Sequence, residues 1–374
     1  MAVIMAVMML ASTGAFLSFA ADDTNAKLTF KDDGTFTILH YCDFQHGPVI
    51  SKFAKDFIRD TVNAENPDLI VLGGDNISGG SNGTKVLVMA AIDQFMSVFE
   101  ELGVPVVIVF GNHDDEGGMT KDEMLKVYQK YDCFIGYDAD PNLYGCGTSN
   151  YPIYDAAGEN IIFNVYAVDS NTYLADESIG GYDYVHEDQV AWYKNTRDAL
   201  KAETGNYVPS FAFQHIIVPQ IYDVIIKNDA SAGGYDLPEG AEGFIGEGPC
   251  PPNTSVPQGY LEFDAMAEKG DVLGMFFGHD HVNAFDVECE GIRLVNTTTS
   301  GFGSYGDENR GCRVITLDAE NLDDFDTELI RYVDFYADDE VKLSAFEYNN
   351  SRDFFDQLVA FFKYVWTAFI SIFA

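Results

Sequence analysis

The chain of 374 residues is poor in basic side chains, with 21 lysines and arginines against 60 aspartates and glutamates. The formal net charge of −39 would repel a nucleic-acid backbone, so we expect no binding to nucleic acids. Such acidity favours solubility, and we interpret it as an adaptation to life outside a cell.

Paired cysteine motifs are also absent. The six cysteines form no C-x-x-C pair, which argues against a closed structural zinc site. Cys133 and Cys146 flank one loop and could form a disulfide if the protein is exported, whereas buried free thiols are the alternative. We find no internal repeat, and no linker that would divide the chain.

The N-terminus lacks the basic start of a typical signal peptide, but its apolar run otherwise resembles one. Residues 2–11 are almost entirely apolar, and the small residues Ala20 and Ala21 suit cleavage. We predict a signal peptide at residues 1–21 and hence a secreted or cell-surface protein. A retained N-terminal anchor is the alternative, which the shortness of the apolar run disfavours.

Strands and helices alternate in the following segment, and each strand ends in a polar cluster. Apolar patterns predict strands at residues 35–41, 68–72 and 104–110, with helices at 48–64 and 85–102 between them. This order is typical of an α/β sheet whose site lies beyond the strand ends. Further helices are predicted at residues 121–131, 187–203 and 260–269, and further strands at 151–154, 160–168, 207–215, 271–277, 284–288, 292–297, 313–317 and 328–335.

Two segments stand apart from this alternation. Residues 218–258 are rich in glycine and proline, and a loop of that length is usually functional or a lid. Residues 351–374, which follow a main domain at residues 22–350, contain an amphipathic helix. Docking on the domain or peripheral contact with a membrane through residues 354–373 is favoured over spanning, because Lys363 would lie in the span. Its apolar positions are Phe355, Leu358, Val359, Phe362, Val365, Trp366, Phe369 and Phe373.

Carboxylate, amide and imidazole side chains cluster after the predicted strands. A carboxylate such as Asp75 at the end of a buried strand is unfavourable unless it is paired or bound to a metal. Taken singly, Asp75 could cap a turn and His215 could be a hydrogen-bonded core residue. His279 and His281 are spaced to share one face, which favours a ligand role.

Oxygen and imidazole ligands suit iron, manganese or zinc ions. The set has the right size for two metal ions that share one carboxylate, and such a pair can hold a phosphoryl oxygen and generate a hydroxide nucleophile. The candidate ligands are Asp43, Gln45, Asp75, Asn112, His215, His279 and His281.

The order of these motifs resembles the calcineurin-like metallophosphoesterase superfamily, and more narrowly its small purple-acid-phosphatase-like branch. The similarity extends from about residue 36 to residue 317. The resemblance implies an α-β-β-α sandwich with two mixed β-sheets and a site at the carboxyl ends of the strands. The motifs are Asp43-x-Gln45, Gly74-Asp75-Asn76-Ile77, Gly111-Asn112-His113-Asp114, Gln214-His215-Ile216-x-x-Pro219, Gly278-His279-Asp280-His281 and the segment 301–306.

The resemblance also implies a function and a role for each residue. The chain would be an exported dinuclear hydrolase of small phosphate esters, a phosphatase or phosphodiesterase in which a metal-bound hydroxide attacks phosphorus. His113 would stabilise the phosphoryl group or protonate the leaving oxygen, with Asp114 orienting it. Asp43, Gln45 and His281 would hold one metal ion, Asn112, His215 and His279 the other, and Asp75 would bridge them.

Two positions depart from the family pattern. Gln45 stands where the family usually has histidine, and Ser78 replaces an aspartate. Side-chain alternation puts Gln45 rather than His46 on the face of Asp43, although His46 could swing in from the loop. A neutral amide is a weaker ligand than imidazole. This departure, together with the amphipathic tail, motivates an alternative function: a surface-located binding or adhesion protein on a degenerate phosphatase scaffold.

Overall fold

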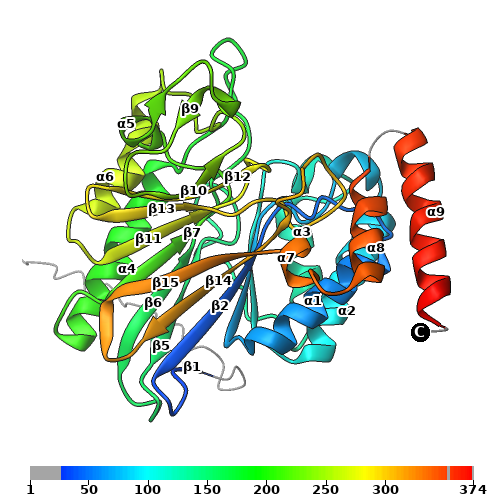
Figure 1. The fold of residues 1–374 in the computed structure, drawn as a ribbon. Helices are drawn as coiled ribbons and strands as arrows, with labels where there is room; N and C mark the ends of the chain where they lie inside the picture. The colour runs from blue at the N-terminus through cyan, green and yellow to red at the C-terminus, as the bar shows by residue number, and fades with distance from the viewer. Residues whose placement is uncertain (1–26, 352–353, 373–374) are drawn as a thin grey trace, which may run out of the picture.

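The computed structural model describes residues 27–351 and 354–372, and the predicted signal peptide lies outside them. Two mixed β-sheets pack face to face, and helices cover both outer faces (Figure 1). One sheet has the strand order β15 (Asn321–Arg331), β14 (Gly311–Asp318), β2 (Thr35–Tyr41), β3 (Leu69–Gly73) and β4 (Val106–Val109). The other has the order β1 (Leu28–Thr29), β5 (Ser149–Tyr154), β6 (Ile161–Ala167), β7 (Ser210–Phe213), β11 (Val272–Phe277), β13 (Ile292–Asn296), β12 (Asn283–Cys289) and β10 (Glu242–Ile245).

Three hydrophobic clusters bind these layers together. The middle cluster lies between the sheets and includes Ile38, Val71, Phe211 and Phe276. The outer cluster on the five-stranded sheet involves α1 (Lys52–Glu65), α2 (Lys85–Leu102), α3 (Lys121–Tyr128), α7 (Tyr332–Phe335) and α8 (Glu340–Asn350). The outer cluster on the eight-stranded sheet involves α4 (Glu187–Thr204), α5 (Ile221–Val224) and α6 (Leu261–Ala267). The predicted α-β-β-α sandwich is therefore confirmed.

The strand directions place the polar clusters at one edge. Strands β2, β3 and β4 are mutually parallel, as are β6, β7, β11 and β13 in the other sheet. Strands that are parallel and adjacent end on the same side, so their carboxyl-terminal loops meet. The loops after β2, β3 and β4 face those after β7 and β11 across the top of the sandwich.

The expected strand at residues 328–335 is only half correct, because β15 ends at Arg331 and α7 follows. The Tyr332 ring stacks on Phe57 of α1 at a centroid distance of 3.6 Å, and its hydroxyl donates to the carbonyl of Ser300. Packing on α1 thus favours a helical turn over the alternation that a strand needs. The segment 218–258 is likewise not one loop, since it contains α5, β10 and a small hairpin of β8 (Ile226–Lys227) and β9 (Tyr235–Asp236).

The C-terminal helix α9 (Phe354–Ser371) docks on α8 at the far edge of the molecule (Figure 1). Tyr348 of α8 contacts the rings of Phe361 and Tyr364, and Lys363 forms an ion pair with Glu347. Docking on the domain, one of the two alternatives predicted for this helix, is thus the arrangement in the structure. Among the described helices, none is long and apolar enough to cross a membrane.

All six cysteines lie within residues 27–351, and there each has a free thiol. Cys133 and Cys146 are buried and free, so these two residues follow the alternative of buried free thiols and not that of a disulfide.

Candidate metal centre

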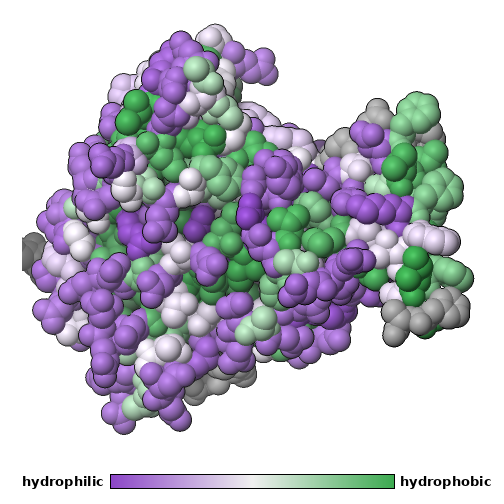
Figure 2. Space-filling view, viewed as in Figure 1, coloured by the Kyte–Doolittle hydropathy of each residue, from purple (hydrophilic) through white to green (hydrophobic). Residues whose placement is uncertain are grey.

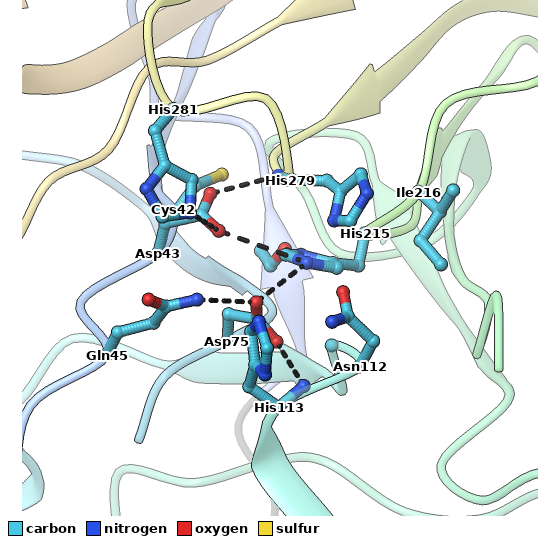
Figure 3. Close-up of polar contacts among 12 residues, drawn as sticks. Cys42, Asp43, Gln45, Asp75, Asn112, His113, His215, Ile216, His279 and His281 are labelled. Carbon is cyan, nitrogen blue, oxygen red and sulfur yellow. Dashed lines mark hydrogen bonds and ion pairs between the residues drawn. The ribbon is translucent and has the colours of Figure 1, made fainter. Parts of the chain in front are cut away.

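Seven buried side chains converge where the two sheets bring their strand ends together (Figure 3). Asp43 and Gln45 follow β2, Asp75 follows β3, and Asn112 follows β4. The opposite sheet contributes His215 after β7, and His279 and His281 after β11. The structure therefore brings together every residue that the sequence suggested as a ligand.

The backbone is strained at several of these positions. Asp43, Gln45, Asp75 and His279 have φ angles of 55°, 42°, 50° and 68°. Residues other than glycine rarely adopt this left-handed conformation, and it persists only where the surrounding structure enforces it. The strain aims the side chains inward from the strand ends, which is typical of a functional site.

Two glycines permit the close approach of the loops. A Cβ atom on Gly111 would lie 2.1 Å from Asp75 Oδ1, and one on Gly278 would lie 2.6 Å from Asp43 Oδ2. Any side chain at either position would displace a carboxylate. These contacts explain why both polar motifs begin with glycine.

Asp75 lies at the centre of the cluster. Its Oδ2 atom is 3.3 Å from His215 Nε2 and accepts a hydrogen bond of 2.8 Å from the amide of Gln45. Its Oδ1 atom accepts a 2.7 Å hydrogen bond from the backbone N–H of His113. Ligand atoms of Asp75, His215 and His279 all lie within 4.8 Å of one another, which is close enough to hold one ion.

Asp43 forms the second half of the centre. Its Oδ1 atom is 3.2 Å from His281 Nε2 and 3.9 Å from His215 Nε2, while Oδ2 accepts from the backbone N–H of His279. Asp43, Asp75 and His281 form a second group with ligand atoms within 4.8 Å of one another. Asp75 belongs to both groups, as a bridging carboxylate must.

Backbone carbonyls orient two of the imidazoles. His215 Nδ1 lies 2.9 Å from the carbonyl oxygen of Gly73, and His281 Nδ1 lies 3.0 Å from that of Tyr305. A carbonyl only accepts, so Nδ1 carries the proton in each ring. In the neutral rings the lone pair of Nε2 then faces the carboxylates, an arrangement common in metal-binding histidines.

The polar atoms at the centre fit a cation. Asp43 Oδ1, Asn112 Oδ1 and His215 Nε2 are buried and have no hydrogen-bond partner among the described residues. Burial alone lowers the pKa of His215, but the carboxylates of Asp75 and Asp43 outweigh it and raise that pKa to about 10. The centre thus favours positive charge, and metal ions would satisfy both the charge and the ligand atoms that lack a partner.

Gln45 occupies its expected place but turns its amide nitrogen toward Asp75. His46 does not replace it. The His46 ring is buried edge-on against Phe95 at 5.1 Å, with Nδ1 hydrogen-bonded to the carbonyl of Gly47. Burial lowers the pKa of His46 to about 4. The half of the centre around Asp43 therefore has an amide where imidazole would bind more strongly.

Asp114 does not orient His113, contrary to the role implied by the family resemblance. Its carboxylate accepts from the backbone N–H groups of Asn76, Ile77 and Gly111, and so ties the loops after β3 and β4 together. Burial and the charge of Asp75 raise the pKa of Asp114 to about 7.

Glu116 contacts His113 instead. Residues Asp114–Glu116 form a 3₁₀ turn, and this turn brings Glu116 Oε2 within 2.8 Å of His113 Nδ1. The His113 side chain is 39% exposed, unlike the buried ligands, so its ring lies at the rim of the centre.

Three tyrosines also contact the candidate ligands, and sequence reasoning missed them. Tyr173 accepts a 3.0 Å hydrogen bond from the side chain of Asn112. The Tyr182 ring lies edge-on to His279 at 4.4 Å, and Tyr305 stacks on His281 at 4.1 Å. Only Tyr305 carried a sequence signal, because it lies in the segment 301–306. The other two come from a loop whose path depends on tertiary structure.

Comparisons with known proteins agree with this geometry. Residues 36–283 match the family model of the calcineurin-like phosphoesterases. The chain is 28% identical to "Probable inactive purple acid phosphatase 14" of Arabidopsis thaliana, with 80% of this chain and 79% of that protein covered. It is also 28% identical to "Probable inactive purple acid phosphatase 29" of the same plant, with 78% and 79% covered. A crystal structure of a dimetal phosphatase from Danio rerio shares the fold, with a TM-score of 0.51, 13% identity, and coverage of 79% of this chain and 98% of that chain.

We predict that the two halves of the centre bind metal unequally. Manganese should bind tightly to the half around His215 and His279 and more weakly to the half that contains Gln45. Gln45→His should strengthen the weaker binding about tenfold or more, because an imidazole replaces a neutral amide. Isothermal titration calorimetry on metal-free protein measures both affinities, and His46→Gln is the matched control. Two equal sites in the wild type, or no gain in Gln45→His, would contradict this prediction.

Proposed function

The chain belongs to the calcineurin-like phosphoesterases, a family of phosphoric ester hydrolases, and from this premise we propose that it is an exported dinuclear metal-dependent hydrolase of small phosphate esters. The observation that carries the proposal is the position of Asp75, which belongs to both groups of candidate ligands. The predicted signal peptide of the chain and its high net negative charge support export to the cell surface or beyond.

The set of oxygen and nitrogen ligands suits two ions, with iron, manganese and zinc as the candidates. When bound, the metal pair would neutralise the charge on the phosphoryl oxygens and lower the pKa of water, so that hydroxide is available to attack phosphorus at neutral pH. Asp43, Gln45 and His281 would hold one ion, Asn112, His215 and His279 the other, and Asp75 would bridge them.

His113 is the group that this chain offers for proton transfer. Its backbone N–H is fixed to Asp75 Oδ1, so the ring lies beside the shared carboxylate. The Glu116 carboxylate accepts a hydrogen bond from Nδ1–H and thereby leaves Nε2 to exchange a proton with the substrate. His113 would protonate the leaving oxygen, with Glu116 as its positioning residue.

The names of the plant relatives keep one alternative open. Two of them are called "Probable inactive", and Gln45 replaces a family histidine in this chain. A binding or adhesion protein on a degenerate phosphatase scaffold would retain the centre without turnover. Turnover of a phosphate ester by the metal-loaded protein separates the two functions.

We predict metal-dependent hydrolysis of p-nitrophenyl phosphate or its bis ester by residues 22–374 with manganese, iron or zinc. His113→Ala should lower kcat by about 10²–10⁴-fold, the typical contribution of a general acid, without loss of bound metal. His186→Ala is the matched control, because that ring stacks on Tyr144 and Tyr184 instead of contacting the centre. Absence of turnover from wild-type protein that binds both ions would favour the binding protein.

We predict that Glu116→Gln lowers kcat about tenfold and leaves KM, metal content and melting temperature unchanged. The amide keeps the shape of the side chain but removes the charge that holds the proton on Nδ1 of His113. Steady-state kinetics beside Glu177→Gln, an exposed position in the loop before α4, measures the effect. A parallel fall in melting temperature would reassign Glu116 to a structural role.

We further propose that α9 contacts a membrane surface. Its outward side presents large apolar side chains, with Phe362 63% and Trp366 64% exposed, and Figure 2 shows hydrophobic surface gathered on this helix. Aromatic and aliphatic side chains of this kind insert at the boundary between headgroups and acyl chains. The net charge of −39 disfavours acidic lipids, so zwitterionic lipids are the expected partners.

The protein, as residues 22–374, should therefore float together with phosphatidylcholine vesicles in a density gradient. Phe362→Glu with Trp366→Glu should abolish flotation, because burying either new charge in the interface is unfavourable. The matched control is Val86→Glu with Met89→Glu, which adds the same charge to exposed apolar positions of α2. Equal flotation of the two double variants would contradict the assignment of α9.

A further inference from the structure

Two tyrosine–glutamate pairs flank the metal centre, one on each side. Tyr173 donates to Glu116 Oε1 over 3.3 Å, and Tyr305 donates to Glu247 Oε2 over 2.8 Å. Tyr173 and Tyr305 are 45% and 51% exposed, so both rings are accessible from solvent. Neither pair belongs to the candidate ligands.

Each pair touches a different half of the centre. Tyr173 accepts from Asn112 and lies against the ring of Tyr182, which in turn contacts His279. Tyr305 stacks on His281 at 4.1 Å. Glu247 comes from the glycine-rich insertion that precedes α6, and its carboxylate also accepts from the backbone N–H of Val282. Both tyrosine–glutamate pairs therefore border the space beside the candidate ligands.

The charge at this rim is negative. Among the described residues, no lysine or arginine forms a hydrogen bond or ion pair with the seven ligands or with the two tyrosine–glutamate pairs. A second anionic group on the substrate that reached Glu247 would meet a carboxylate that no basic side chain neutralises, whereas Glu116 is paired with His113. A cationic group would instead meet carboxylates and the faces of tyrosine rings, the two partners that proteins use for ammonium ions.

We propose that the preferred substrates are phosphate esters whose alcohol carries an ammonium group, such as phosphocholine. This inference rests on the proposed function and names its substrate class. The phosphoryl group lies at the ligands, and the ammonium group lies against Tyr305 and Glu247. The oxygen of water bonds to phosphorus, the bond from phosphorus to the alcohol oxygen breaks, and that oxygen takes a proton, so phosphate and the ammonium alcohol are released.

The net charge of the whole chain acts in the same direction. At −39, the protein would attract cations toward its surface and slow the approach of polyanionic esters. A zwitterionic ester such as phosphocholine carries a cationic group that this field attracts, in addition to the phosphoryl group that would bind the metal ions.

The experiment compares phosphocholine with 3,3-dimethylbutyl phosphate, in which carbon replaces the quaternary nitrogen at nearly constant shape. We expect kcat/KM to favour phosphocholine by about tenfold, within the range of a cation–π contact. Glu247→Gln and Tyr305→Leu should each reduce this ratio toward one, whereas Tyr305→Phe, which keeps the ring, should retain most of it. Glu239→Gln, an exposed position in the same insertion, is the matched control.

Further arms distinguish the source of the ammonium group and the reason for any failure. Comparing the hydrolysis rate of glycerophosphocholine with that of phosphatidylcholine in vesicles separates a soluble ester from a lipid headgroup. Turnover of p-nitrophenyl phosphate with equal use of phosphocholine and its neutral isostere would overturn the inference and leave the proposed function standing. If no ester is hydrolysed, the proposed function fails. Calorimetric binding of the two isosteres to the metal-loaded protein then decides the ammonium preference by itself.

Discussion

Two buried carboxylates, Asp43 and Asp75, face the same small space at the ends of neighbouring strands. Such an arrangement is unfavourable unless positive charge lies between them, and imidazoles from the opposite sheet surround that space. The close approach of Gly111 and Gly278, the left-handed backbone at four ligands and the carbonyls behind His215 and His281 all maintain it. The sandwich as a whole can be understood as the support that holds these two carboxylates together.

Much of this arrangement could be predicted from the sequence because strong local patterns determine it. The strand at 35–41 and the helix at 85–102 have the predicted bounds, since clear apolar periodicity covers their whole length. The seven ligands converge as expected because parallel strands end at one edge of a sheet.

Contacts that depend on tertiary packing could not be predicted from the sequence. The Asp114 carboxylate accepts hydrogen bonds from backbone N–H groups of two loops, and the adjoining 3₁₀ turn brings Glu116 within hydrogen-bond distance of His113. No local sequence pattern predicts either contact. The short helix α7 forms because Tyr332 stacks on Phe57, a residue far away in the chain. The tyrosines at the rim reach the centre from loops, where side-chain direction follows neither period 2 nor period 3.6.

The central claim is that Asp75 is shared by two metal ions, and anomalous diffraction from crystals grown with manganese tests it most directly. The account predicts two anomalous peaks, one among Asp75, Asn112, His215 and His279 and one among Asp43, Gln45, Asp75 and His281, with the second weaker. A single peak that leaves one of the carboxylates without a metal, or no peak at all, would contradict it.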